Sequence, residues 1–485
     1  MALRLESPTN INFAVIFRMI GWLLVIEAMF MVAPVVTSYI YGEDDFTGNL
    51  ISLGITLVAG LNMATVIRPK RNYMGKREAI LLTVLVWVVF ALFGMLPFML
   101  GNLHMGFIDA FFESTSGFTT TGASTIINLE AAPHGIIIWR SVMQWIGGMG
   151  IILFTLAVLP MLNHQGGIQL FNAEVSGLTH DKLRPRISQT AKALWMVYLS
   201  LTVAEGILLL AGPMPTFDAI CYTLSTVSTG GFPTKGQYVA EWGSLYIEIV
   251  IIVFMFLGSI NFQLIYRAAR GDVRALFCND TFRWYITVIF IMFVLFEVVM
   301  HIDGIYDNAH DRIVYPLFQI VASMSSAGFV ITDHTAWGPF PMLMFLIMMF
   351  FGACAGSTSS GAKIDRLVLF MKSTRNEFYR ILHPNSIQSV RLNGRVVPME
   401  NVSKVVAFIS IYVVTIIVCT AMLCLCDMPV MRALYSSVSC ISNIGYGDWT
   451  QVNAAVKVVL SLAMIMGRLE LFSFLVIFTK DFWVK

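Results

Sequence analysis

Charge is what this 485-residue chain has least of. Only 12% of its residues are charged and 57% are hydrophobic, whereas a soluble domain carries about 25% charged residues. Most side chains must therefore face lipid or buried protein, which predicts an all-α polytopic membrane protein in contact with membrane lipid. The net charge of +2 gives no indication of a nucleic-acid-binding surface, and we expect no nucleic-acid partner.

The chain also lacks the motifs of several other classes of protein. Its seven cysteines do not have zinc-binding spacing and several fall in apolar runs, which favours small buried hydrophobes over a disulfide framework. No His-Glu-x-x-His is present, and the one serine-rich run has no evident His or Asp partner, so an intramembrane enzyme is disfavoured. No Gly-x-Gly-x-x-Gly follows a predicted strand. Regulation by a nucleotide would then need a separate cytosolic subunit.

Long apolar runs make up most of the sequence, and a spanning helix needs about 20 apolar residues. Residues 11–41 and 50–67 predict a first pair of helices, and the first run is too long to be a signal peptide. Eight further spans are expected, as outer helices at 79–100, 191–211, 284–301 and 405–426 and inner helices at 135–162, 244–266, 340–371 and 454–479.

Between each outer and inner helix lies a short amphipathic segment that ends near a glycine. Residues 443–448 read Asn-Ile-Gly-Tyr-Gly-Asp, and the amphipathic segment before them starts thirteen residues before Gly445. The same spacing from segment start to glycine recurs at Gly122, Gly231 and Gly328, which together with Gly445 we call the anchor glycines. A repeat of roughly 100 residues suits a membrane hairpin with a re-entrant loop. Each of these glycines has a small residue six positions earlier, namely Ser116, Ser225, Ala322 and Ser439.

This repeat predicts four pseudo-repeated helix–pore loop–helix units around one ion pore, plus an N-terminal helix pair. The expected boundaries are 1–70 for the two-helix extension and 71–165, 166–275, 276–385 and 386–485 for the pore units.

Irregular backbone survives at membrane depth only where protein buries it or where it lines an aqueous cavity. Glycine permits backbone angles that point successive carbonyls to one side, and rings of such carbonyls replace the hydration shell of K⁺. No carboxylate occupies the carbonyl frame at the four glycines, so ion selection would come from backbone dipoles. The C-termini of the pore segments would add partial negative charge, and Glu113 is expected to fix the first loop rather than bind ions.

Basic residues indicate the orientation, because they concentrate in cytoplasmic loops. The segments that follow the first pair and the first three units are all basic, so both termini are expected inside and the glycine loops are expected to face the periplasm. These basic residues are Lys70, Arg71, Lys76, Lys182, Arg184, Arg186, Arg267, Arg270, Arg274, Arg366, Lys372, Arg375, Arg380, Arg391 and Arg395.

On these residues the whole chain resembles the membrane subunit of the Trk/Ktr/HKT potassium-uptake superfamily, and it is most similar to the bacterial TrkH-type subunits. The resemblance implies that each loop contributes a stretch equivalent to the Thr-Val-Gly-Tyr-Gly filter of potassium channels, although only the fourth loop is close to it in sequence. The residues implied to bind K⁺ are Thr120, Thr121, Gly122, Thr229, Gly230, Gly231, Ser326, Ala327, Gly328, Asn443, Ile444 and Gly445.

The same resemblance implies a bacterial inner-membrane protein with K⁺ as its permeating ion and no bound organic cofactor. It also implies a homodimer of the membrane subunit and a cytosolic nucleotide-binding regulatory subunit with RCK domains, similar to TrkA.

A glycine- and serine-rich run at 352–363 interrupts the third inner segment. Such residues suit a close helix-packing face, but three glycines and a Ser-Thr-Ser-Ser run also weaken a helix. We favour a flexible obstruction beneath the filter, which matches the family's intramembrane gating loop. The gate residues expected in this run are Gly352, Gly356, Ser357, Thr358, Ser359, Gly361 and Lys363.

Arg468 lies within the last inner helix, where a charged residue is costly and is a functional candidate. It either pairs with a neighbouring carboxylate such as Glu470 or faces the pore. Residues two apart do not share a helix face, so we favour a pore-facing Arg468 that hinders cations below the filter, as the family resemblance also implies.

The leading prediction is therefore a potassium-uptake membrane subunit with channel-like permeation, and it is not an enzyme. The alternative is a coupled K⁺/H⁺ or K⁺/Na⁺ symporter. Proton relays usually use intramembrane histidines or carboxylates. All eight histidines are expected in loops or at helix ends, but Glu27, Glu205 and Glu470 remain possible carriers, so coupling stays open.

Overall fold

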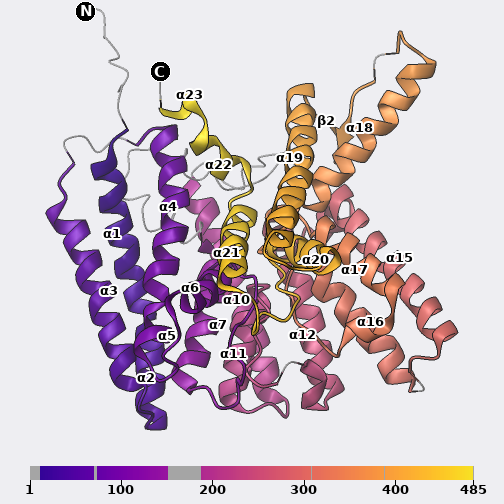
Figure 1. Cartoon of the computed structure of the whole chain (residues 1–485). Coiled ribbons are helices and arrows are strands. Elements are labelled where there is room, and N and C mark those ends of the chain that lie inside the picture. The colour runs from indigo at the N-terminus through magenta and orange to yellow at the C-terminus, as the bar shows by residue number, and fades with distance from the viewer. Residues whose placement is uncertain are drawn as a thin grey trace, which may run out of the picture.

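The computed structural model describes residues 11–69, 74–150, 187–236, 238–306, 308–386 and 388–483 (Figure 1). Within these ranges six helices are long and apolar enough to cross a membrane, or up to eight if each of two bent helix pairs counts as one span. The predicted all-α polytopic membrane fold is confirmed. Strands are confined, in the same ranges, to the short pair β1 (Arg391–Leu392) and β2 (Arg395–Val396). The predicted basic residues Lys70, Arg71, Lys182, Arg184 and Arg186 lie outside the described residues.

The N-terminal pair consists of α1 (Phe13–Phe30), α2 (Val32–Tyr41) and α3 (Phe46–Val66). Helix α1 packs on α3 so closely that a Cβ at Gly60 would lie 2.9 Å from the carbonyl oxygen of Gly21. The acidic turn after α2 has a structural role, because Glu43 accepts a 2.8 Å hydrogen bond from the backbone N–H of His134. A carboxylate is stabilising at a helix N-terminus, so this contact ties the pair to the helix that begins there.

The outer helices, and the short helices before the glycine loops that we call the pore helices, follow in the predicted order. The outer helices are α4 (Lys76–Gly94) with α5 (Leu96–Leu100), α10 (Ile187–Ala211), α15 (Asp280–Asp303) and α19 (Met399–Cys424). The short helices before the glycine loops are α6 (Phe107–Phe118), α11 (Thr216–Val227), α16 (Ala309–Met324) and α20 (Val430–Ile441).

The inner helices differ from the long spans that the sequence predicts. They begin as α7 (His134–Gly148), α12 (Leu245–Gly258), α17 (Pro339–Phe351) and α21 (Ala454–Arg468). Helix α12 then breaks into α13 (Phe262–Ala269) with a bend of 104°, and α21 breaks into α22 (Phe472–Leu475) and η4 (Val476–Phe478) with a bend of 111°. Continuous spans over 244–266 and 454–479 were therefore wrong. The predicted range 135–162 runs beyond the described residues after 150.

Local chemistry explains these breaks. Asn261 ends the first half of the second inner helix by capping the next one, since its side chain accepts from the N–H of Gln263 at 2.8 Å. The third inner helix ends at Gly352, whose φ of +64° is unfavourable for other residues. It resumes as α18 (Ile364–Leu382), which projects from the helical body on the side that carries both termini (Figure 1).

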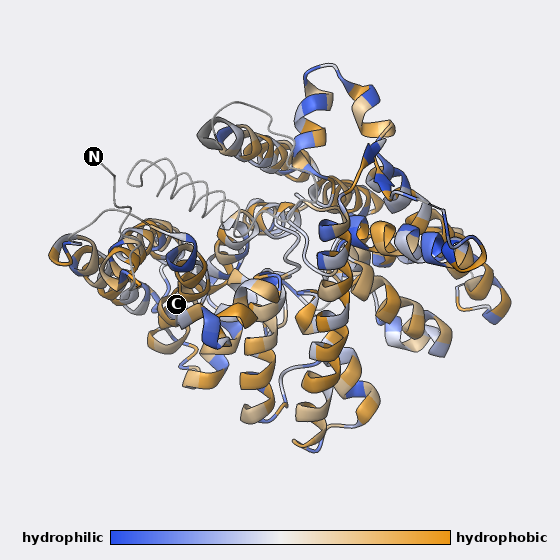
Figure 2. Cartoon of the chain, turned by 90° about the horizontal axis from the view of Figure 1, so that it is seen from above, coloured by the Kyte–Doolittle hydropathy of each residue, from blue (hydrophilic) through white to orange (hydrophobic). Residues whose placement is uncertain are grey.

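The elements close into a ring through one repeated contact. Each inner helix packs against the pore helix of the next unit, in the pairs α7–α11, α12–α16, α17–α20 and α21–α6. The last pair joins the end of the chain to its first unit. The helices that form the rim consist largely of hydrophobic residues (Figure 2). Helices α3, α15 and α19 expose large apolar residues such as Val58, Phe290 and Ile417, as lipid-facing helices do.

Candidate functional site

The four glycine loops have the same backbone conformation. The first residue of each predicted filter triplet has a left-handed φ, of 56° at Thr120, 53° at Thr229, 55° at Ser326 and 54° at Asn443. The anchor glycines return to positive φ, with values of 81° at Gly122, 79° at Gly231, 72° at Gly328 and 82° at Gly445. Left-handed backbone costs a non-glycine residue about 1–2 kcal/mol, so the surrounding contacts must hold these loops in place.

The ends of the pore helices supply part of this support. In each loop the N–H of the residue before the anchor glycine donates to the carbonyl of the small residue six positions before that glycine. This bond closes the C-terminus of the pore helix in the manner of a left-handed cap. The four bonds run from Thr121 to Ser116 (2.9 Å), Gly230 to Ser225 (2.8 Å), Ala327 to Ala322 (3.0 Å) and Ile444 to Ser439 (2.9 Å).

The four loops touch one another in a closed ring. A side chain on any anchor glycine would collide with the carbonyl oxygen of the residue before the next anchor. Only glycine allows this approach, because the neighbour in contact is backbone and cannot move aside. The contacts join Gly122 to Gly230, Gly231 to Ala327, Gly328 to Ile444 and Gly445 to Thr121. The four contacts therefore link the loops into one closed ring, with a carbonyl oxygen at each junction.

Above the ring lies a cavity of about 280 Å³, lined by all four anchor glycines together with Asp333 and Asp448. Hydrogen bonds from the side chain and backbone of Thr450 hold the pKa of the Asp448 carboxyl below its usual range. A negative charge thus stands at the mouth of the cavity at neutral pH, which favours cations over anions.

A buried ion pair supports the first two loops from behind. Arg140 and Glu113 are both fully buried, with the Nε of Arg140 donating to Glu113 at 2.8 Å. Glu113 also accepts from the backbone N–H of Thr125 at 2.8 Å, and the guanidinium of Arg140 lies 4.0 Å from the ring centroid of Phe232. The pair therefore links the loop of Gly122 (loop 1) to the loop of Gly231 (loop 2). Glu113 is thus bonded to the first loop, where the sequence analysis expects it to hold that loop in place.

The fourth loop is fixed by amide and aromatic side chains. Asn443 donates to the hydroxyl of Thr121 at 3.0 Å and to the carbonyl of Met464 at 2.9 Å. The hydroxyl of Tyr446 accepts from Gln319 of the third pore helix at 2.6 Å. Loop 4 is thus bonded to both of its neighbours in the ring.

The serine-rich run at 352–363 lies on the other side of the ring and touches it directly. The hydroxyl of Thr358 donates to the carbonyl of Gly258 at 2.9 Å and lies 3.3 Å from the hydroxyl of Thr229. The N–H of Ser360 donates to the hydroxyl of Ser326 at 2.9 Å. The run is therefore packed under loops 2 and 3, and it is not helical.

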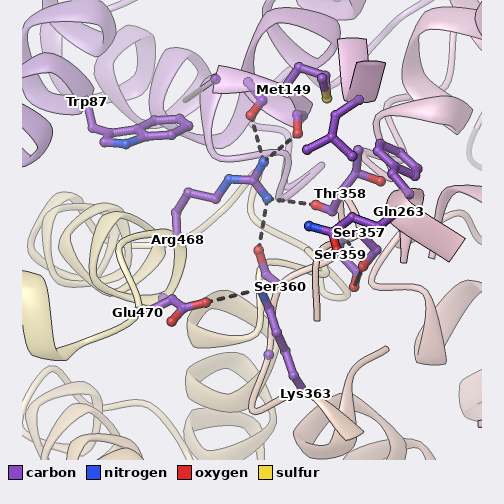
Figure 3. A pocket seen from close by; sticks show the side chains of 18 residues that line it. Trp87, Met149, Gln263, Ser357, Thr358, Ser359, Ser360, Lys363, Arg468 and Glu470 are labelled. Carbon is purple, nitrogen blue, oxygen red and sulfur yellow. Dashed lines mark hydrogen bonds and ion pairs between the residues drawn. The ribbon is translucent and has the colours of Figure 1, made fainter. Parts of the chain in front are cut away.

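Arg468 binds this run from the side (Figure 3). Its guanidinium donates to the carbonyl of Thr358 at 2.9 Å and to the hydroxyl of Ser360 at 3.1 Å. The opposite nitrogen donates at 2.6 Å to the carbonyl of Gly147, at the C-terminus of α7, where a cation is favourable. Arg468 joins the fourth inner helix, the run and the first inner helix beside a cavity of about 110 Å³.

Glu470 has a separate set of partners. Its carboxylate lies 3.1 Å from Nζ of Lys363 and also binds the guanidinium of Arg366. Lys363 and Glu470 both have positive φ, at 67° and 55°. Two strained backbone positions, one on each broken helix, are thus joined by one ion pair.

The structure brings the predicted filter residues into one ring and the predicted gate residues directly beneath it, while their roles stay predictions. Sequence reasoning missed the buried Arg140, Gln144 and Gln319. Arg140 carried a usable signal, since it is a charge within an apolar inner helix. The two glutamines carried none, because Gln144 bonds to the second unit and Gln319 bonds to Tyr446 of the fourth unit as well as to its own loop.

Apolar spans, re-entrant helices and a central ring of glycine loops together define a polytopic integral membrane protein organised around one axis. The TrkH profile, described as cation transport protein, matches residues 55–484. The chain belongs to this family.

Relatives of known name match along nearly the whole chain. The Trk system potassium uptake protein TrkH of Salmonella typhimurium is 34% identical over 481 residues, covering 97% of this chain and 99% of the relative. The Trk system potassium uptake protein TrkG of Escherichia coli is 29% identical over 479 residues, with 97% and 98% covered. The crystal structure of the potassium transporter TrkH from Vibrio parahaemolyticus aligns with a TM-score of 0.88 at 31% identity, covering 97% of this chain and 100% of that one.

Proposed function

We propose that the chain is the potassium-uptake membrane subunit of a bacterial Trk system, and that K⁺ passes in a channel-like way through the ring of four loops. The family relationship supports the Trk assignment. The observation that carries the mechanism is the closed ring of carbonyl oxygens, each set against the anchor glycine of the neighbouring loop. Carbonyl oxygens in such a ring replace the hydration shell of K⁺.

In this proposal the division of the chain follows the sequence repeat. An N-terminal extension (1–70) precedes four pore units (71–165, 166–275, 276–385 and 386–485). Each unit contributes one quarter of the filter, with the permeating K⁺ held by the three filter residues of each loop.

The run at 352–363 and Arg468 form the proposed gate. The run lies directly under filter residues Thr229 and Ser326, and Arg468 adds a positive charge at the same level. A cation leaving the filter would meet both obstacles. The cavity of about 110 Å³ at this point is lined by the run, by Arg468, by the end of α7 and by the start of α13.

Orientation and partners follow from charge and family. Arg267, Arg270 and Arg274 and the basic helix α18 belong on the cytoplasmic side by the positive-inside rule. Both termini lie on the side from which α18 projects (Figure 1), so the proposed filter opens to the periplasm. A homodimer and a nucleotide-binding RCK subunit are the proposed partners, the latter bound to this basic face.

Substitution of the anchor glycines tests the filter. Gly445→Ser places a side chain against the carbonyl of Thr121, and Gly231→Ser places one against that of Ala327. Both should lower the K⁺/Na⁺ permeability ratio, measured as reversal potentials in mixed-salt proteoliposomes. Gly304→Ser is the matched control, because Gly304 also has positive φ (60°) but has no atom within 4 Å of an added Cβ. An unchanged ratio in both filter variants would refute the proposed filter.

Coupled symport is a second candidate, favoured by two buried carboxyl groups. Glu27 in α1 and Glu205 in α10 are both 0% exposed, and in the described part of the chain neither has an ion-pair partner. Intramembrane carboxyl groups of this kind serve in proton relays. Uptake of ⁸⁶Rb⁺ under an imposed proton gradient distinguishes the two functions. Uphill uptake that is abolished by Glu205→Gln would favour symport.

A further inference from the structure

Loop 2 differs from the other loops at the residue before its anchor glycine. Loops 1, 3 and 4 have Thr121, Ala327 and Ile444 there, whereas loop 2 has Gly230. The φ of Gly230 lies outside the left-handed range, in contrast to Gly231. The backbone conformation therefore does not require glycine at 230, and the missing side chain needs another reason.

The side chain of Gln144 fills the space beside Gly230. Gln144 is fully buried on α7, the inner helix of the first unit. A Cβ at Gly230 would lie 2.6 Å from Oε1 and 2.8 Å from Nε2 of Gln144, closer than van der Waals contact allows. The amide donates from Nε2 to the carbonyl of Gly230 at 2.6 Å and accepts from the N–H of Phe232 at 3.2 Å. Gln144 thus holds loop 2 on both sides of Gly231.

This contact makes one carbonyl of the ring unlike the others. The oxygen of Gly230 is the one set against Gly122 in the ring. In the described part of the chain, the corresponding oxygens of Thr121, Ala327 and Ile444 accept no side-chain hydrogen bond. A carbonyl oxygen has two lone pairs, and a donor on one of them fixes its direction and reduces the electron density that it offers to a cation.

We propose that Gln144 is a specificity-determining residue of the ring, an inference that rests on the filter function proposed above. Its amide reduces the field strength of the Gly230 carbonyl and keeps that carbonyl from turning toward a smaller ion. Discrimination between cations of equal charge depends on the field strength and rigidity of the coordinating dipoles. Gln144 therefore favours K⁺ over the smaller and more strongly hydrated Na⁺.

Gln144→Met tests this role, because methionine keeps the length of the side chain and loses both hydrogen bonds. The K⁺/Na⁺ permeability ratio should fall about fivefold, the factor that corresponds to the net free energy of one hydrogen bond. Gly230→Ala should have the same effect with Gln144 still in place, because the added Cβ pushes the amide off the loop. Ser141→Ala is the control, since Ser141 is buried on the same helix and its hydroxyl donates to the carbonyl of Ile137 in that helix.

The double variant Gln144→Met/Gly230→Ala separates a shared mechanism from two independent defects. If both changes act by removing the same amide contact, the double variant discriminates no worse than either single variant. Additive losses would overturn the inference. Melting temperatures in detergent identify variants that fail to fold, and Gly230→Ala alone decides the question if Gln144→Met is unstable.

The outcomes also keep this inference apart from the proposed function. An unchanged ratio in Gln144→Met and Gly230→Ala, with a lowered ratio in Gly445→Ser, refutes the role of Gln144 and leaves the filter intact. Unchanged ratios in these three variants and in Gly231→Ser refute the filter itself.

Discussion

At the scale of single residues, the positions of the anchor glycines could be predicted from the sequence, whereas the contacts of the polar residues around them could not. The anchor glycines repeat in the sequence because each must leave room for a neighbouring backbone carbonyl. A repeated steric requirement is visible in one chain, so the ring positions could be predicted. The contacts of Arg468 and Gln144 could not, since they bind carbonyls 321 and 86 residues away in sequence.

Arg468→Ala should raise K⁺ flux. Two unit charges about 4 Å apart repel by about 4 kcal/mol at an effective dielectric near 20, and the variant removes this repulsion together with the bonds to Thr358 and Gly147. Arg468→Lys keeps the charge but offers fewer donors, so we expect an intermediate flux. Uptake of ⁸⁶Rb⁺ into proteoliposomes measures both effects.

A purely structural role for Arg468 predicts the reverse. Lower flux together with a lower melting temperature in Arg468→Ala would show that the guanidinium stabilises the fold without limiting ion passage.

At the scale of elements, helix positions were predictable and helix continuity was not. Apolar length located the outer and inner helices, but the breaks at Asn261 and Glu470 depend on caps and tertiary contacts. Only the break at 352–363 had a compositional signal, in its glycines and serines. Hydropathy could not predict the helix breaks, because it reports only how apolar a segment is. A break depends on whether the freed backbone N–H and C=O groups find hydrogen-bond partners in other units.

The run at 352–363 allows a matched pair of variants. The hydroxyl of Thr358 donates to the carbonyl of Gly258, whereas in the described part of the chain the hydroxyl of Ser357 bonds within the run, to Cys354 and Ser359. Thr358→Ala should therefore raise K⁺ flux, while Ser357→Ala should leave it near the wild-type value. Deleting 356–359 should raise it most, because the obstruction itself is shortened.

Comparison of these fluxes decides between a gate and a packing face. Equal or reduced flux in Thr358→Ala and in a correctly inserted deletion variant would favour packing.

At the scale of the whole molecule, polar contacts at the starts of the pore helices join successive units. Lys457 of the fourth inner helix binds Asp109 of the first pore helix at 2.6 Å. His310 of the third pore helix lies 3.1 Å from Glu248 of the second inner helix. The hydrogen bond to Asp311, with the nearby charge of Glu248, raises the pKa of His310 above its ordinary value of 6.5.

The His310 contact predicts a pH-dependent stability. Its contribution is complete below the ordinary pKa and is lost as the pH rises through the raised pKa of the folded state. The melting temperature of the wild type should therefore exceed that of His310→Gln at about pH 6 and approach it by about pH 9. A difference that is constant across this range would contradict the assignment.

The ring closes between the fourth and first loops, where Asn443 bonds to Thr121, 322 residues earlier in the same polypeptide. During synthesis, the first loop must wait for the last quarter of the chain to leave the ribosome before it has both neighbours. A prematurely terminated product would lack the fourth loop, so its ring would not close. Because the four units are encoded by separate stretches of one gene, each unit can change in sequence independently of the others. Every copy of the protein therefore has the same asymmetric ring.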